Sequence, residues 1–296
     1  MDASIMFLGQ QEELTWTNVG ISSLFLIALV FLSFFLKLQI ERPLIISSIR
    51  CVLQLTLMGY ILKDVFSKDD PLITSLIVAV LILLSSFEIV YQKSVLTYKG
   101  MFLSVLVSVG VSTIAISIAG TRIGLNETPF WKPTKFIPTV GMIVSNCMSA
   151  TALGISSCLS HFRIHRESIE TRLSYGACRW EAAKPIAIES VRTAMLPTIN
   201  GMSILGLISI PGMMTGQIMA GAPVGQAAMY QQIMMFMISG CSAFSVLYCV
   251  AICVRVAIDS DHRLRLDRIL DGNNNKMGYS SSSRLFCCFK RRKVEQ

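Results

Sequence analysis

Polar side chains inside long apolar stretches are the residues of this sequence best placed to do chemistry. Arg50 and Gln54 are four residues apart and would share one face of a helix. Glu88 and Asn146 stand in two further apolar stretches. Placing a charge at membrane depth costs at least ~2.5 kcal/mol, so it needs a partner or water. An Arg50–Glu88 ion pair would supply one, and both a structural role and a polar translocation path remain open for these residues.

The second half of the chain adds softer and more irregular features. Nine of the sixteen Met residues fall between Met195 and Met237. Thioethers suit Cu(I) better than iron, but Met is also a common packing residue, which is the reading we prefer here. If a metal ion is moved, oxygen ligands from Glu88, Asn146, Gln217 or backbone carbonyls would suit iron. The segment rich in Gly and Pro predicts irregular backbone and a candidate outer gate: Pro211, Gly212, Met213, Met214, Thr215 and Gly216.

The usual signatures of catalysis and cofactor binding are missing from the sequence. It contains no GxSxG, HExxH or CxxC motif, and its three His exclude a His-rich metal site. It contains no Gly-Lys dipeptide and therefore no P-loop. We expect no enzyme and no cofactor bound by this chain, with metal binding unknown; if ATP drives the protein, another polypeptide hydrolyses it.

The composition indicates an integral membrane protein. Apolar residues make up 53% of the 296 positions, and only 15% are charged, against about a quarter in soluble domains. Roughly 20 apolar residues cross a bilayer as a helix, and seven stretches qualify. We therefore predict an all-α polytopic membrane protein with about seven transmembrane helices. The stretches are 18–36, 43–62, 71–91, 101–119, 136–159, 194–210 and 229–254.

The distribution of Lys and Arg predicts the orientation. With the N-terminus outside and the C-terminus cytosolic, the cytosolic segments hold 20 of these residues and the outer segments 5. This divides the chain into an extracellular segment 1–17, a transmembrane permease domain 18–254 and a basic, largely flexible cytosolic tail 255–296. Asn126 begins a glycosylation sequon in a predicted outer loop, and its use stays open. Cys287 and Cys288 beside the basic cluster of the tail are candidates for palmitoylation, or are simply unmodified.

The long inner segment 160–193 resembles a docking element. Ile164, Ser168, Thr171 and Tyr175 recur at helical spacing with charges between them, which predicts an amphipathic helix over 164–175. Gly176 can end that helix in a left-handed conformation, and a second amphipathic stretch begins at Arg179. A stiff helix braced by a turn could enter a partner's groove; the alternative is an amphipathic linker resting on lipid headgroups.

Several blocks of the sequence resemble ABC-transporter permeases of the FetB type, the UPF0014 family. Glu170, Gly176 and Ile186 follow the spacing of the EAA loop, although Thr171-Arg172 and Ile188-Glu189 depart from it. Closer matches surround that loop, and the resemblance covers about residues 42–254. These blocks are Arg50 with 53–55 and Gly59, 137–148, 166–177, 196–200 and 210–218.

The resemblance implies a permease subunit that pairs with a separate ABC ATPase and works as a homodimer in the bilayer. Glu167, Glu170, Gly176 and Ala177 would form the ATPase-docking site, with ATP bound by the partner. The implied cargo is iron moved outward, or for plant members linked to aluminium tolerance a nucleotide sugar such as UDP-glucose. No nucleic acid is expected as a partner. The candidate translocation path comprises Arg50, Gln54, Glu88, Asn146, Asn200 and Gln217.

Two other functions fit parts of the sequence. A gradient-driven carrier without an ATPase would also use buried charges and a broken sixth span. A seven-span receptor would share the span count, but its Asp-Arg-Tyr and Asn-Pro-x-x-Tyr signatures are missing. The sequence leaves open the cargo, the direction of transport, and the choice between plasma membrane and endomembrane.

Overall fold

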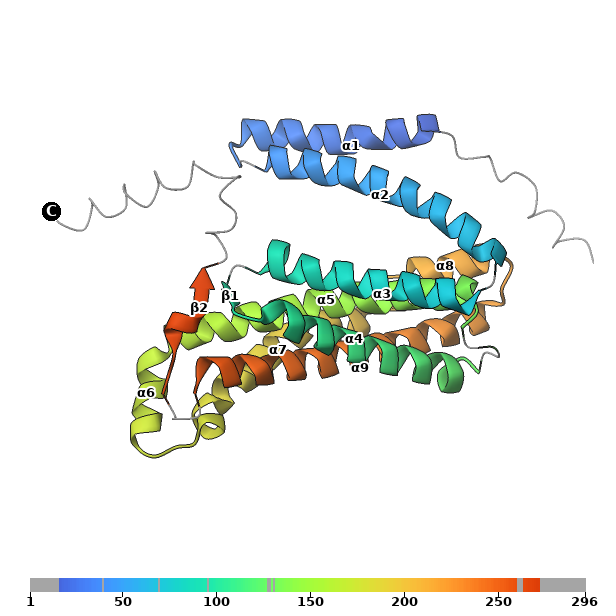
Figure 1. Cartoon of the computed structure of the whole chain (residues 1–296). Coiled ribbons are helices and arrows are strands. Elements are labelled where there is room, and N and C mark those ends of the chain that lie inside the picture. Colours follow the sequence, from blue (N-terminus) through green and yellow to red (C-terminus); the bar gives the residue numbers. More distant parts are fainter. Residues whose placement is uncertain are drawn as a thin grey trace, which may run out of the picture. The chain divides into compact units, whose positions relative to one another are not determined.

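The tertiary structure is a computed structural model whose described part is almost entirely helical (Figure 1). It divides into two compact units, Met1–Lys68 and Asp69–Gln296, which we call the N-terminal and C-terminal units. The described residues are 16–38, 40–68, 70–94, 96–126, 129, 131–259 and 263–271.

The N-terminal unit is a pair of apolar helices. Helix α1 spans Trp16–Phe35 and α2 spans Glu41–Lys68. Lys37 between them adopts a left-handed conformation, with φ at 52°, where the chain reverses. Almost no apolar side chain of this pair is buried within the protein. Such surfaces are stable only where lipid or another protein covers them.

The C-terminal unit begins with two helices that each end in a π-helical turn. Helix α3 covers Pro71–Glu88 and α4 covers Met101–Ala119, with the short strand β1 (Leu96–Tyr98) between them. Gly100, with φ at 82°, precedes α4 in a left-handed conformation that suits glycine. The remaining elements are α5 (Pro133–Ile164), α6 (Arg166–Ser174), α7 (Arg179–Ile204), α8 (Gly212–Met219), α9 (Val224–Ala257) and β2 (Ile269–Asp271).

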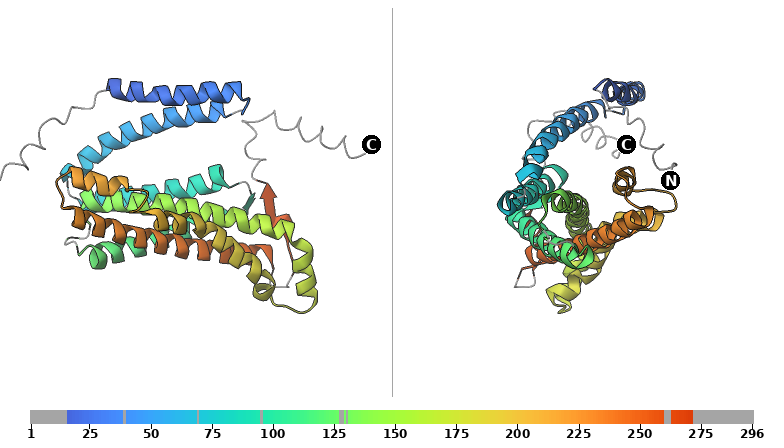
Figure 2. Two further views of the ribbon diagram at one scale, coloured as in Figure 1. Left: turned by 180° about the vertical axis from the view of Figure 1, so that it is seen from behind. Right: turned by 90° about the vertical axis from the view of Figure 1, so that its right-hand side faces the viewer.

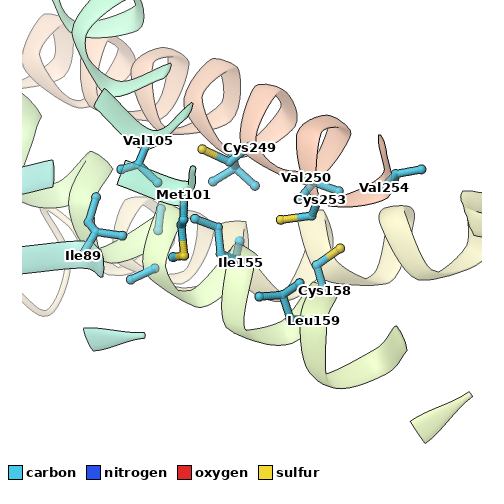
Figure 3. Packing of buried hydrophobic residues seen from close by; sticks show 14 of the residues in the cluster. Ile89, Met101, Val105, Ile155, Cys158, Leu159, Cys249, Val250, Cys253 and Val254 are labelled. Carbon is cyan, nitrogen blue, oxygen red and sulfur yellow. The ribbon is translucent and has the colours of Figure 1, made fainter. Parts of the chain in front are cut away.

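Helix α5 is the centre of this unit. It packs against α3, α4, α7 and α9, and the end-on view of Figure 2 shows the helices of this unit grouped around it on part of its circumference. Figure 3 shows the core at its interface with α9, where Cys158, Cys249 and Cys253 lie among aliphatic side chains. Five Cys residues of the apolar helices are fully buried and pack as small hydrophobic side chains: Cys147, Cys158, Cys241, Cys249 and Cys253.

A seam of small polar residues holds α4, α5 and α9 together. Thr151 and Ser245 share a hydroxyl hydrogen bond of 3.0 Å, and Ser108 donates to the Ser245 carbonyl at 2.9 Å. Gly154 of α5 lies so close to α7 and α9 that a Cβ there would meet Ala194 at 3.3 Å and Val246 at 3.1 Å. Small residues and hydroxyl groups of this kind let membrane helices approach one another closely.

Among the described residues, six helices are long and apolar enough to cross a membrane. This confirms the all-α multi-pass class, whereas the count of seven and the orientation stay predictions. The predicted stretch 194–210 does not form such a helix, because α7 ends at Ile204 and its first half is charged. Its apolar part, 193–204, extends only about 18 Å, less than the roughly 30 Å hydrocarbon core. The spanning helices cover Thr17–Phe35, Glu41–Phe66, Pro71–Lys93, Met101–Gly124, Pro133–Ile164 and Val224–Ala257.

Candidate functional site

Segments far apart in sequence meet at one end of the C-terminal unit. Strand β1 pairs antiparallel with β2, and Tyr98 lies opposite Ile269. Arg163 donates a hydrogen bond of 3.3 Å to the Ile269 carbonyl, and the Arg255 guanidinium lies 5.9 Å from the centre of the Trp180 ring. The charge count assigned three segments of these contacts to the cytosol: 92–100, 160–193 and the tail that begins at 255. The structure brings described residues of all three together at the end of the unit where α6 lies (Figure 1). Burial there raises the pKa of Tyr98.

The predicted cytosolic loop is mostly helical. Helix α5 runs unbroken to Ile164, and the short helix α6 starts at Arg166 after a break at His165. The residues that recur at helical spacing, from Ile164 to Tyr175, do not form the face that packs against the bundle. Ile164 is 69% exposed and Tyr175 is 87% exposed. Instead, Ile169 is buried and Leu173 packs beside it. One turn of α6 thus rests on α5 and α7, and its opposite face is open.

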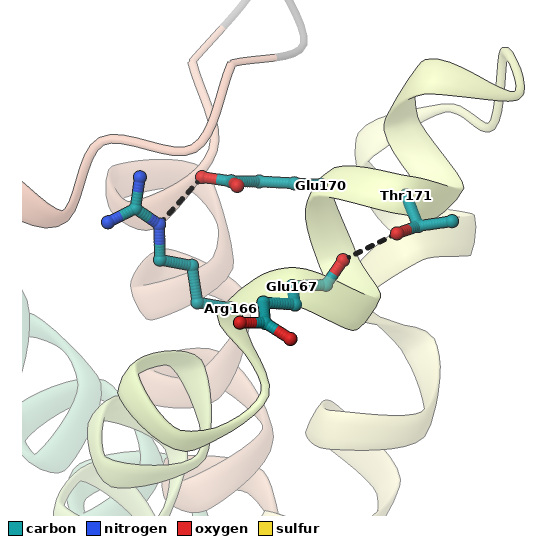
Figure 4. A network of polar contacts seen from close by, with 4 residues as sticks. All are labelled: Arg166, Glu167, Glu170 and Thr171. Carbon is teal, nitrogen blue, oxygen red and sulfur yellow. Dashed lines mark hydrogen bonds and ion pairs between the residues drawn. The ribbon is translucent and has the colours of Figure 1, made fainter.

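The open face of α6 carries the predicted acidic residues. Arg166 Nε donates to Glu170 Oε1 at 2.8 Å, and the Thr171 hydroxyl donates to the Glu167 carbonyl (Figure 4). Both side chains of the Arg166–Glu170 pair are about half exposed. An exposed pair at this spacing contributes only about 0.3–0.5 kcal/mol. These charges therefore do little for stability and remain accessible to a partner.

Gly176 ends α6 as the sequence predicted. Its φ is +87°, its amide donates to the Leu173 carbonyl, and the Ala177 amide donates to the Arg172 carbonyl, both at 3.1 Å. These two bonds form a Schellman motif, which satisfies carbonyls that the end of a helix leaves free. Ala177 then packs against the hydrophobic core, and this contact fixes the turn to the rest of the C-terminal unit.

Helix α7 begins at Arg179, also as predicted. The Glu181 carboxylate accepts a hydrogen bond of 2.9 Å from the Cys178 amide, which completes a capping box. The same hydrogen bond lowers the pKa of Glu181. Helix α6, the Gly176 turn and the start of α7 thus form one braced hairpin. We call residues 166–181 the docking hairpin.

The polar residues proposed for a path are only partly brought together. Glu88 is half-buried and accepts a hydrogen bond of 2.6 Å from Gln92. Lys93 donates to the Ser149 hydroxyl at 3.1 Å, which joins the end of α3 to α5. Asn146 lies about one turn before Ser149 and is exposed. Its side-chain amide donates a hydrogen bond to the Met142 carbonyl. An exposed polar surface midway along a membrane helix indicates contact with water or another chain.

The other path candidates lie elsewhere. Arg50 and Gln54 are exposed on α2 in the N-terminal unit, so the proposed Arg50–Glu88 pair stays a prediction. Asn200 is exposed near the end of α7, and Gln217 is half-buried on α8. Sequence reasoning named Ser149 only as a polar neighbour of Asn146, and it did not name Lys93 as a site residue. The signal for both was a polar side chain close in sequence to Asn146 or Glu88.

The candidate gate is more regular than predicted. Residues Gly212–Gly216 belong to helix α8, and Pro211 sits at its N-cap. The prediction of irregular backbone there was wrong, because the first N–H groups of a helix have no partner and a proline costs nothing beside them. The irregular segment is 205–211 instead, where Gly206 has φ at +87° and Leu205 bridges to Ser209. A gating role for either segment stays a prediction.

Two further predictions fall partly or wholly outside the described residues. Asn126 is described, with φ at 48°, but the rest of its sequon is not. Cys287 and Cys288 lie beyond Asp271, where the description ends. Within the described part, no three His, Cys, Asp or Glu residues are arranged to hold a metal ion.

Comparison with known proteins places these features in a family. The model of the uncharacterised protein family UPF0014 matches residues 16–258. The UPF0014 membrane protein slr1647 of Synechocystis is 32% identical, over 76% of this chain and 87% of its own length. The probable iron export permease protein FetB of Escherichia coli is 26% identical, over 86% and 96%. The protein ALUMINUM SENSITIVE 3 of Arabidopsis thaliana is 28% identical, over 76% and 80%. No solved structure matches.

Proposed function

The chain belongs to the UPF0014 family of membrane proteins, and from this premise we propose that it is the membrane-spanning permease subunit of an ABC transporter. A separate ATPase chain would bind the docking hairpin and drive alternating access. One relative is named a probable iron export permease, which supports a transport role. The proposed cargo is a metal ion or a related small solute.

The docking hairpin is the observation that carries this proposal. Its lower side is fixed by Ile169 and Leu173, whereas Tyr175 at its tip is 87% exposed. Exposed aromatic residues on a rigid support are typical anchors of protein interfaces. Helices α5 and α7 both lead from the hairpin into the helix bundle. A displacement of the hairpin by the bound ATPase would therefore move these two core helices together.

A second copy of the chain would complete the path. Asn146 and Ser149 expose polar groups near the middle of α5, a 32-residue helix. Lipid would leave the Asn146 side-chain oxygen and the second amide hydrogen without hydrogen-bond partners, because the amide's described bond is the one to the Met142 carbonyl. A homodimer that faces these surfaces toward each other would enclose a polar route with Lys93 and Glu88 near one end.

Association with an ATPase tests the proposal. The full-length chain would be purified in mild detergent from its native membrane, as wild type and as Tyr175→Ala. We expect a P-loop ATPase with the wild type and at least a tenfold loss with the variant, since anchor residues often contribute 2 kcal/mol or more. Leu207→Ala is the matched control, because Leu207 is 90% exposed in the irregular segment 205–211.

The alternative is a gradient-driven carrier that works alone. Reconstituted vesicles that transport cargo with an ion gradient, without nucleotide and without any co-purifying ATPase, would establish it. If equal amounts of ATPase co-purify with the wild type and with Tyr175→Ala, the permease role would stand, but the docking hairpin would not be the site where the ATPase binds.

A further inference from the structure

A pocket of about 390 Å³ lies between the end of α7, helix α8 and the first half of α9. All three helices belong to the C-terminal unit. The pocket borders the irregular segment 205–211, with Gly206 and Pro211 in its wall. Three Met residues, Met202, Met214 and Met235, line it together with Gln231. None of the residues that line it is His, Cys, Asp or Glu.

Gln231 shows that this pocket is not simply a packing defect. Its side chain is only 8% exposed, and its carbonyl oxygen Oε1 is buried without a hydrogen-bond partner in the described part of the chain. A buried carbonyl oxygen that has lost water and gained no donor destabilises the protein. If the Gln231 side chain turns toward the pocket that it borders, an occupant would restore the missing interaction, and this occupant would have to be a cation or a hydrogen-bond donor.

The methionines of this region fall into two groups. Met234 and Met237 are buried in the core, with 0% and 7% exposure, and serve packing. Met202, Met214 and Met235 are half-buried and line the pocket, each from a different helix, and Met235 also packs against the core. Three thioether side chains that border one pocket from three helices give a possible donor set that a single packed helix could not provide.

We propose that this pocket binds a soft monovalent cation of the Cu⁺ or Ag⁺ type. The thioether sulfurs of Met202, Met214 and Met235 would supply soft neutral ligands, and Gln231 Oε1, once turned toward the pocket, would supply an oxygen ligand. Soft ligands select such ions over Fe²⁺ or Mg²⁺, which prefer nitrogen and oxygen donors. Because no carboxylate lines the pocket, a divalent ion would meet no compensating charge there.

This inference deepens the proposed function and rests on it, since it names the cargo class of the permease. Helix α8, which contributes Met214 to the pocket, lies at the end of the unit away from helix α6 (Figure 1). A cargo site at this end would be linked to the hairpin by α7, which runs from one to the other.

Silver binding to the purified full-length chain tests the site. The chain would be treated with N-ethylmaleimide to block accessible thiols, and Ag⁺ would be titrated by calorimetry in chloride-free buffer. The test variant is Met214→Leu/Met235→Leu, a nearly volume-conserving change. The control is Met229→Leu, because Met229 is on α9 but 58% exposed and outside the pocket.

We expect one Ag⁺ per chain, a Kd at least tenfold higher in the double variant, a smaller rise in Gln231→Leu, and no change in the control. Equal affinity in all variants would overturn the proposal, and so would displacement of Ag⁺ by equimolar Fe²⁺. X-ray absorption of the wild type and of the double variant identifies the ligands of the ion. A sulfur shell that is reduced in the double variant supports the site, because buried Cys thiols are also sulfur donors. An unchanged sulfur shell, or a shell of only nitrogen and oxygen, overturns it.

The same preparations separate this inference from the permease role. ATPase association without Ag⁺ binding would remove the soft cation as cargo and leave the permease intact. Ag⁺ binding at the pocket without any ATPase would keep the site and overturn the ABC role on which its cargo function rests.

Discussion

Replacing Gly176 by Ala should weaken ATPase docking without unfolding the membrane bundle. Gly176 has φ at +87°, and a Cβ there would meet no atom within 4 Å. The cost of the substitution is therefore backbone strain alone, about 1–2 kcal/mol for an L-residue in a left-handed conformation. Nothing in the surrounding packing adds to it or relieves it.

The backbone strain lowers the population of molecules in which residues 172–177 form the Schellman turn. If only the Schellman turn presents Tyr175 correctly, 1–2 kcal/mol reduces the apparent affinity for the ATPase by a factor of about 5–30. Gly176→Asn should lose less affinity for the ATPase than Gly176→Ala, because Asn tolerates the left-handed conformation better than Ala. Gly176→Pro should lose most, since proline fixes φ near −65° and removes the amide that donates to Leu173.

Affinity of the three variants for the purified ATPase would be measured by biolayer interferometry, beside the thermal midpoint of the chain in detergent. Gly221→Ala is the matched control, because Gly221 has φ at +89°, equally open surroundings and a position in the turn between α8 and α9. Unchanged affinity in all three Gly176 variants would refute the docking turn. An equal loss in Gly221→Ala would attribute the effect to general strain.

The remaining predictions concern the bundle and the start of α7. Gly154→Val should lower stability by about 1–3 kcal/mol through overpacking, since its Cβ would lie within 3.3 Å of two neighbouring helices; thermal unfolding in detergent checks this, with Gly141→Val, which has open surroundings, as the control. Thr151→Val removes a hydrogen bond to α9 and should cost about 0.6–1.7 kcal/mol in the same assay. The lowered pKa of Glu181 means that its carboxylate stabilises the helix start fully at neutral pH. This contribution is lost as the pH falls below the ordinary pKa of Glu and through the lowered pKa of Glu181. The protection factor of the Cys178 amide, which corrects for the pH dependence of intrinsic hydrogen exchange, should fall over this range, and this change should vanish in Glu181→Gln.

The local features of the docking hairpin were predictable because they depend on short-range interactions. A glycine can adopt a left-handed conformation that other residues resist, so Gly176 marked the end of α6. The start of α7 at Arg179 followed from the return of amphipathic spacing. The buried face of α6 was not predictable, because Ile169 and Leu173 are buried by contact with other helices. Spacing alone favoured the exposed stripe of Ile164 and Tyr175.

The sequence by itself determined that this chain is a multi-pass helical membrane protein, because apolar length and the energetic cost of burying charge in lipid depend only on composition along the chain. It also determined its family through matched blocks of residues. Only the tertiary structure decided which distant residues share a surface. Lys93 reaches Ser149, Thr151 reaches Ser245, and three methionines line one pocket together with Gln231. These contacts depend on how the helices pack in three dimensions, and no local pattern of residues encodes that packing.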